Sequence, residues 1–567
     1  MSEKDVRRST FDAQPSKFDV RSSKFNVRSS IRFLAAVLVW GLAVAGPSRS
    51  AAQLAGRDGP PNIVVILASS LGYSDLGSFG GEMSTPHIDR LAGDGLRFTQ
   101  FYNAGRSAPS RAALLTGLYP HQVAVGQSTT DYRRPGYRGN LSPDAATLAE
   151  LLRQGGYQTM MVGKWHLTPH IGSQGPKHTW PVNRGFERFY GTIHGVGSYF
   201  APATLCRGGQ FLDERDPDFY YTDRIAQHAG TFLEDAARGN RPFFLYVALP
   251  APHWPLHAPD SAVGRYRGRY AMGWDELRKS RLQRMQALGL VKPHWQLTPR
   301  DERVGSWELN RLRPWQQRRM EVYAAQVELM DAAVGRILEN LRQVGAERNT
   351  LVMFLSDSGA SAEEIAPNRI GPEVPRATRA RRQVQVGNNP SVLPGPEDTF
   401  QSYGIAWANA SNTPFRLYEG DVHEGGIATP LIVRWPAVLR QTGRTTDQTG
   451  HVIDVVPTCL EVARIAYPTM YQGRRLPPLE GRSFAPVLEG RTRETPTLFW
   501  EHEGNRAVRD GKWKLVGRHR RPWELYDMEA DRTEMNNLAD RFPTVVQNLA
   551  EQYAAWAKRS NVLPWRE

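Results

Sequence analysis

The chain has 567 residues, of which 40% are hydrophobic, so it is long enough to bury a large core and is not a disordered chain. Its net charge of +14 comes from 71 basic and 57 acidic residues, without a long uninterrupted basic run. This charge pattern indicates a solvated basic surface rather than a nucleic-acid binder, and it leaves a weak attraction to polyanions open.

The first 52 residues are expected to be a leader that contains a signal peptide. Arg32 precedes an apolar run, Phe33 to Ala45, that is too short to span a bilayer comfortably. Small residues that suit cleavage near Ala52 follow the run. We therefore expect export to the periplasm or the outside of the cell, with no stable transmembrane anchor. An uncleaved anchor is the alternative.

Apolar runs of strand length predict the centre of the fold. Each run is nearly continuous rather than alternating, as in strands that are buried on both faces of a mainly parallel sheet. Helical patterns at 145–156 and 320–345 lie between them. The order predicts an α/β fold, a mixed and mainly parallel sheet with helices on both faces. The predicted strands are Asn62–Ala68, Tyr157–Gly163, Pro242–Leu249 and Asn349–Ser356.

The pattern changes near the C-terminus. After about residue 496, short strands with turns precede an amphipathic helix from about Thr544 to Ala557. We expect a main domain over residues 53–495 and a small C-terminal α+β subdomain over 496–567, in which antiparallel strands are closed by the terminal helix. The Pro- and Arg-rich run 365–399 lacks periodicity, and a solvated surface loop is favoured there over contact with an anionic substrate.

Polar side chains follow each predicted strand at its carboxyl end. In an open α/β sheet, ligands bind outside the carboxyl ends of the strands. We therefore expect these side chains to converge on one crevice. They are Ser69 and Ser70, Lys164 and His166, His253, and Asp357 with Ser358.

A serine begins another predicted helix, in the stretch Phe101 to Gln122. The residues Ser-Ala-Pro-Ser-Arg at 107–111 place Ser107 near the helix N-terminus, where backbone N–H groups favour an anion. Taken alone, this pattern is typical of an N-cap serine with proline in the first turn.

In its context, the stretch resembles the signature of the sulfatase family, formylglycine-dependent arylsulfatase-like enzymes of the alkaline phosphatase superfamily. The signature is C/S-x-P-S/T-R followed by AALLTG. The resemblance extends from about Asn62 to the C-terminus, and it implies an alkaline-phosphatase-like fold and the hydrolysis of sulfate esters. Later family blocks are matched in order by GKWH, APHWPLHAP, FLSDSG, NTPFRLYEGDVHEGGIATPLIVRWP and GHVIDVVPT.

The resemblance also implies roles for individual residues. In the family, the first signature residue is oxidised to formylglycine, whose hydrate attacks sulfur. Here that residue is Ser107, so a maturase that oxidises serine is implied. Arg111 would hold the modified residue, and Lys164 and His166 would contact the sulfate and the formylglycine. His253 would bind sulfate and protonate the leaving alcohol.

The chain departs from the family at the calcium site. The family has two aspartates after the first strand and a later Asp-Asn pair, which form an oxygen cage for a divalent cation. This chain has Ser69 and Ser70, then Asp357 followed by Ser358. Calcium affinity depends strongly on the number of carboxylates. We therefore expect a weak or lost metal site with Asp357 as its one inherited ligand.

A second departure is Glu419, which stands where the family carries a lysine that contacts the substrate's sulfate. A carboxylate at this position repels an anionic ester. Two aspartates replaced by serines and one lysine replaced by glutamate leave the fixed charge unchanged. Alternatively, Glu419 acts as a replacement ligand beside Asp357, and the sequence leaves both interpretations open.

Two functions follow from these residues. The first is an exported arylsulfatase-like sulfuric ester hydrolase that acts on a sulfated small molecule or glycan through a Ser107-derived formylglycine, with impaired activity. The alternative is a non-catalytic pseudoenzyme that binds sulfated glycans or a protein partner. A phosphoesterase is less favoured, because the carboxylates and histidines of a two-zinc site are not apparent.

Overall fold

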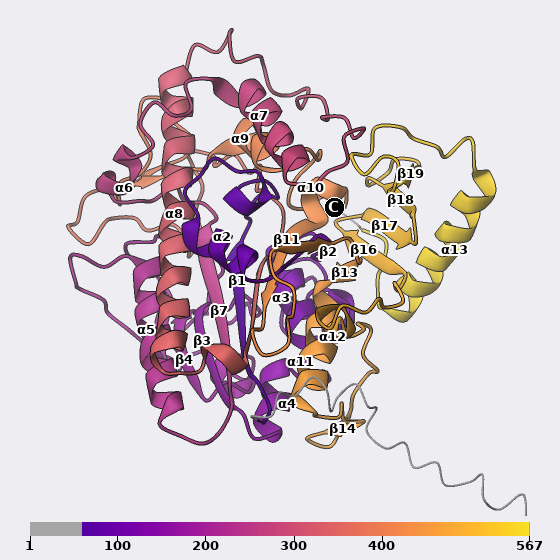
Figure 1. The fold of residues 1–567 in the computed structure, drawn as a ribbon. Coiled ribbons are helices and arrows are strands. Elements are labelled where there is room, and N and C mark those ends of the chain that lie inside the picture. The colour runs from indigo at the N-terminus through magenta and orange to yellow at the C-terminus, as the bar shows by residue number, and fades with distance from the viewer. Residues whose placement is uncertain (1–58, 566–567) are drawn as a thin grey trace, which may run out of the picture. The chain divides into compact units, whose positions relative to one another are not determined.

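The computed structural model describes residues 59–565 (Figure 1). The predicted leader, residues 1–52, lies outside the described residues. Within residues 59–565, no helix is both long enough and apolar enough to cross a membrane. The described residues pack as one compact unit.

A large mixed sheet forms the centre of the fold. Its strands follow one another across the sheet in the order β12-β2-β11-β8-β1-β7-β3-β4-β5-β6, and β13 pairs with β2. The five strands from β8 to β4 are parallel, whereas β11 is antiparallel to both of its neighbours. The mainly parallel sheet is confirmed. The bounds are β1 (Asn62–Ser69), β2 (Leu96–Tyr102), β3 (Gln158–Lys164), β4 (Arg188–Thr192), β5 (Leu205–Arg207), β6 (Gln210–Phe211), β7 (Phe243–Pro252), β8 (Thr350–Ser356), β11 (Ala428–Arg434), β12 (Arg444–Thr446) and β13 (Gly450–His451).

Helices cover both faces of this sheet (Figure 1). One face carries α2 (Pro86–Gly93), α5 (Tyr221–Ala237) and α8 (Arg313–Gln343). The other carries α3 (Ser107–Thr116), α4 (Leu148–Gln154), α11 (Val455–Ala463) and α12 (Ala485–Leu488). Further helices are α6 (Asp260–Gly264), α7 (Gly273–Ala287), α9 (Gly404–Ser411) and α10 (Glu424–Ile427), with 3-10 turns at Gly77–Phe79, Pro120–Val123, Pro181–Asn183, Glu347–Asn349 and Val452–Asp454.

Strand β1 shows why the apolar runs are continuous. Val64 and Ile66 pack in the core beneath α5 and α8, whereas Val65 and Leu67 pack in the core beneath α3 and α11. Successive side chains of a strand point to opposite faces. Both faces of β1 are therefore buried, and the pattern has no polar alternation.

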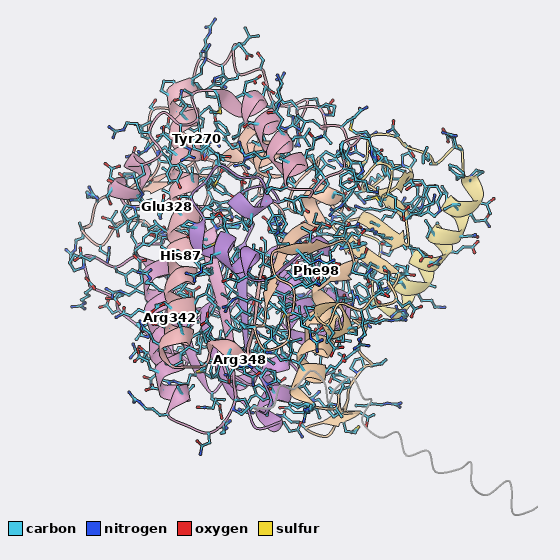
Figure 2. All side chains as sticks on the ribbon, in the orientation of Figure 1. His87, Phe98, Tyr270, Glu328, Arg342 and Arg348 are labelled. Carbon is cyan, nitrogen blue, oxygen red and sulfur yellow. The ribbon has the colours of Figure 1, made fainter. Side chains whose placement is uncertain are left out.

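The long helix α8 lies close against α2, where Figure 2 labels His87. A Cβ added to Gly335 of α8 would lie 2.5 Å from the imidazole of His87. The carboxylate of Asp331 accepts hydrogen bonds from the backbone N–H groups of His87 and Ile88, at 3.2 and 2.7 Å. Gly335 and the Asp331 carboxylate, both within α8, therefore fix the position of the first turn of α2.

The C-terminal residues form a four-stranded antiparallel sheet and a terminal helix, as predicted. The face with Trp500 and Val516 joins one core of the main sheet, and the face with Phe499 and Leu515 joins the other. The boundary at residues 495 and 496 stays a prediction. The elements are β16 (Leu498–His502), β17 (Asn505–Asp510), β18 (Trp513–Gly517), β19 (Glu524–Asp527) and α13 (Pro543–Arg559).

The Arg-rich run 365–399 is mostly irregular but is anchored to the fold. Its residues Ile365 and Val384 form a small core with Trp254 and Phe400. The anchor places this loop beside Trp254, the neighbour of His253. Two short pairs of strands complete the fold, β9 (Gln385–Val386) with β10 (Thr399–Phe400) and β14 (Met470–Tyr471) with β15 (Arg474–Arg475).

A buried ion cluster joins the C-terminal sheet to the segment that follows Glu419. Lys514 is fully buried, and its Nζ lies 2.9 Å from Glu424 and 2.8 Å from Glu534. Arg532 Nε also donates to Glu424, at 2.7 Å. Burial acts to raise the pKa of Glu424, but Lys514 and Arg532 outweigh it and lower the pKa to about 2. The cluster is therefore charged.

Lys514→Met is expected to lower the free energy of unfolding by about 3–5 kcal/mol, because it leaves the buried Glu534 without its cation and removes one of the two cations paired with Glu424. Lys512→Met is the matched control, since Lys512 pairs with Asp527 at the surface and its removal should leave stability nearly unchanged. Urea denaturation followed by circular dichroism measures both variants. Equal losses in the two variants would contradict a stabilising cluster at Lys514.

Candidate functional site

The carboxyl ends of β1, β3 and β8 meet at the N-terminus of α3. Lys164 Nζ, at the end of β3, donates a hydrogen bond to Ser69 Oγ of β1 at 2.8 Å. Ser107 Oγ, at the start of α3, donates to Asp357 Oδ2 after β8 at 2.7 Å. Side chains that are far apart in the sequence therefore form one buried network.

Asp357 lies at the centre of this network. Its Oδ2 accepts hydrogen bonds from Nη2 and Nε of Arg111, at 2.7 and 3.0 Å, and its Oδ1 accepts one from the Ser70 N–H at 3.0 Å. Both Arg111 and Asp357 are fully buried. Burial acts to raise the pKa of Asp357, but Arg111 and Lys164 outweigh it and lower the pKa. Asp357 is therefore a carboxylate whose charge Arg111 neutralises.

Ser107 occupies the first position of α3. The helix starts here because Pro109 suits its first turn and the Arg106 carbonyl accepts a hydrogen bond from the Ser110 N–H, at 2.9 Å. The hydroxyl of Ser107 lies 3.3 Å from His166 Nδ1 and accepts a 3.3 Å hydrogen bond from Arg111 Nε. The oxygen is thus held between a cation and an imidazole.

The other ionisable groups of the site have pKa values shifted by burial. Burial, with a contribution from Arg111, lowers the pKa of Lys164 to about 7. Burial and Lys164 lower the pKa of His253 to about 3 and that of His166 well below its usual value. Both imidazoles are therefore neutral at neutral pH.

The hydrogen bonds of His253 indicate which of its nitrogens carries the proton. His253 Nδ1 lies 2.8 Å from the carbonyl oxygen of Trp254, and a carbonyl only accepts. We assign the proton to Nδ1 on this contact. The Nε2 atom of the neutral ring is then an acceptor.

The residues at the family's calcium-ligand positions do not fit a calcium ion. Ser70 Oγ donates to Glu419 Oε2 at 3.1 Å and lies 3.1 Å from Ser358 Oγ. Lys164 and Arg111 occupy the oxygens of Ser69 and Asp357. Calcium takes six to eight oxygen ligands with several carboxylates. Neutral hydroxyls and a carboxylate already bound to arginine do not provide such a set.

Glu419 and Asp357 are joined through Ser70. Ser70 contacts both carboxylates, through its N–H and its hydroxyl. Within residues 59–565, no group of three or more His, Cys, Asp or Glu side chains could hold a metal ion. The interpretation of Glu419 as a replacement ligand beside Asp357 stays a prediction.

Two of the site residues have left-handed backbone conformations. Ser70 has φ of 56° and His166 has φ of 58°. Such conformations are costly for residues other than glycine and cluster at functional sites. They turn the chain sharply where β1 and β3 end.

A cleft of about 290 Å³ opens beside this network. Glu419 connects the network with the cleft, because it accepts a hydrogen bond from Ser70 and also lines the cleft. Arg106 is not among the site residues predicted from the sequence, although it directly precedes Ser107. The lining residues are Arg106, Arg303, Ser361, Ala362, Glu363, Tyr418, Glu419, Asp421 and Arg518.

Family models and curated relatives that match this chain are described as sulfatases. Residues 61–465 match the family model described as Sulfatase, and residues 417–558 match the model described as N-sulphoglucosamine sulphohydrolase, C-terminal. An uncharacterised sulfatase of Schizosaccharomyces pombe is 34% identical, over 89% of this chain and 94% of its own length. An arylsulfatase of Klebsiella aerogenes is 34% identical, over 71% of this chain and 87% of its own.

Solved structures share the fold. One of them is a protein in complex with its substrate D-glucosamine-2-N,6-O-disulfate. It superposes with a TM-score of 0.59 at 21% identity and covers 88% of this chain and 98% of its own. At this identity the likeness concerns the fold alone.

Dialysed wild-type protein is expected to retain no stoichiometric calcium in elemental analysis. The triple variant Ser69→Asp/Ser70→Asp/Ser358→Asn should bind calcium, because it supplies the carboxylates and the amide that the ion requires. Ser391→Asp, which adds a carboxylate on an exposed loop, controls for added charge alone. One equivalent of calcium in the dialysed wild type would refute our assignment of the serines.

Affinity for inorganic sulfate is expected to fall as the pH rises through about 7, because burial lowers the pKa of Lys164 to that value. Below this pH the ammonium form attracts an anion, and above it the neutral amine does not. Lys164→Met should bind sulfate weakly, with little dependence on pH in this range. Calorimetric titration on both sides of neutrality measures the slopes, and the same slope in both proteins would argue against Lys164.

Proposed function

The chain belongs to the sulfatase family, and on that premise we propose that it binds organic sulfate esters beside Ser107 and hydrolyses them with low activity. The observation that carries the proposal is the position of Ser107 Oγ, between the guanidinium of Arg111 and the imidazole of His166 at a helix N-terminus. The substrate is a sulfated small molecule or glycan. We also propose export through the leader predicted at residues 1–52.

Ser107 fits the formylglycine on which the family depends. Its side-chain oxygen is buried and has polar neighbours from three side chains, so an oxygen-bearing group would be hydrogen-bonded there. Formylglycine supplies a hydrated aldehyde as nucleophile and avoids the hydrolysis of an ordinary ester intermediate. Arg111 and His166 would hold it. Its formation requires a maturase that oxidises serine.

Lys164 provides the positive charge for a sulfate group, because the charge of Arg111 is paired with Asp357. The side chain of Lys164 is buried, where weaker solvent screening strengthens its attraction for an anion. His166 Nδ1, 3.3 Å from Ser107 Oγ and neutral, is placed to accept a proton from an oxygen at that position.

Three features account for low activity. The donor set does not supply the Lewis acid that polarises sulfate in a calcium-loaded site. Glu419 places a carboxylate where the family has a lysine, and it repels the ester. His253 has no proton on Nε2 in the neutral state, so the leaving alcohol takes its proton from water.

A non-catalytic role is the second candidate, and one contact favours it. The hydroxyl of Ser107 donates to Asp357 at 2.7 Å, which engages the oxygen in the internal network. In that case the protein binds sulfated glycans or a protein partner without turnover. The two functions differ in the chemical state of Ser107.

Mass spectrometry of the peptide that contains Ser107, taken from the native host, is expected to show a fraction lighter by the mass of two hydrogen atoms. Ser107→Ala should show no such fraction and no release of 4-nitrophenol from 4-nitrophenyl sulfate, because the nucleophile is absent. Ser391→Ala, a change at an exposed serine outside the signature, controls for the loss of a serine hydroxyl elsewhere. Unmodified serine in every preparation would refute the hydrolase and favour the binding protein.

A further inference from the structure

The cleft beside the site contains two charged side chains that form no ion pair within 4 Å among the described residues. Of its six charged side chains, four have oppositely charged partners within 4 Å. Among the described residues, Arg106 and Glu419 have none. The neutralised groups are Arg303, paired with Asp301 at 2.8 Å, Glu363, paired with Arg369, and Arg518 with Asp421, paired at 3.7 Å.

Glu419 is a half-buried carboxylate at the inner end of the cleft. Its one hydrogen-bond donor among the described residues is the neutral hydroxyl of Ser70, at 3.1 Å. A sulfate held by Lys164 would therefore have an anion on one side. A cation placed against Glu419 would remove the repulsion, and within residues 59–565 no basic side chain pairs with that carboxylate.

Arg106 lies close to Glu419 in space. A Cβ added to Gly420, the next residue, would lie 3.7 Å from Arg106 Nη1 and 3.9 Å from the imidazole of His502. His502 is fully buried, and both of its ring nitrogens lack hydrogen-bond partners. Burial and Arg106 lower the pKa of His502 to about 4, so it adds no charge at neutral pH. The cleft is therefore lined by one cation and one anion that lack ion pairs.

We infer that the cleft selects dipolar ligands, namely organic sulfate esters that also carry a protonated amine. The amine binds to Glu419, and the sulfate binds towards Arg106 and Lys164, so the ligand supplies the cation that Glu419 lacks. The inference rests on the proposed function, which assigns the sulfate position.

The size of the cleft limits the ligand further. Ligand pockets usually measure about 300–1,000 Å³, and this cleft, at about 290 Å³, lies at the lower end. It suits an aminoalkyl sulfate or a single sulfated amino sugar with a free amine.

Two matched probes test the inference without requiring turnover. The first is 2-aminoethyl sulfate, which is dipolar, and the second is ethyl sulfate, which carries the sulfate alone. Calorimetric titration of the wild-type protein below neutral pH, where the amine is protonated, is expected to show at least about tenfold tighter binding of the dipolar probe. Glucosamine 6-sulfate and its N-acetyl derivative repeat the comparison on a sugar.

Variants of two cleft carboxylates test whether the preference for the dipolar probe depends on Glu419. Glu419→Gln keeps a hydrogen-bond acceptor for Ser70 but removes the charge, and it should bind the two probes equally. Glu419→Lys should prefer ethyl sulfate. Glu363→Gln is the matched control, because Glu363 is already paired with Arg369, and it should keep the wild-type preference.

The outcomes separate the two proposals. Equal binding of the two probes to the wild type, or a preference that survives in Glu419→Gln, overturns the inference and leaves the proposed function standing. If neither probe binds to the wild type, both are overturned. The comparison of the two probes on the wild type does not depend on the folding of any variant.

Discussion

The buried ion pair between Arg111 and Asp357 is the interaction on which the site depends. It joins the first turns of α3 to the end of β8, and a further hydrogen bond from Arg111 Nη1 to the Lys164 carbonyl, at 2.9 Å, adds the end of β3. A charge removed from water is tolerated only with a partner. Because each partner is fully buried, neither can change alone, and the three elements keep a fixed relation around Ser107.

The same ion pair also determines how charge is distributed in the site. Arg111 neutralises Asp357, and hydroxyl contacts run from Ser358 through Ser70 to Glu419. Of the charged side chains that line the cleft, Arg106 and Glu419 have no ion pair within 4 Å among the described residues. A ligand that carries both charges would therefore provide the missing partners of these two side chains.

The sequence predicted the central strands to within three residues at each end, because strands buried on both faces leave continuous apolar runs. It also predicted which strand ends carry polar groups. It could not predict that Ser70 contacts both Asp357 and Glu419, which are separated from it by 287 and 349 positions. Lys514 lies in a short polar-apolar strand that is typical of a surface, so its burial depends on tertiary packing alone.

The backbone conformation at Ser70 is one that other residue types adopt more often than serine does. A φ of 56° is uncommon for serine, whereas aspartate and asparagine adopt this region several times more readily than most residues. The main chain therefore has a shape that suits a carboxylate, and it holds that shape with a hydrogen bond from its own N–H to Asp357. The backbone at position 70 therefore already has a conformation that an acidic residue adopts readily.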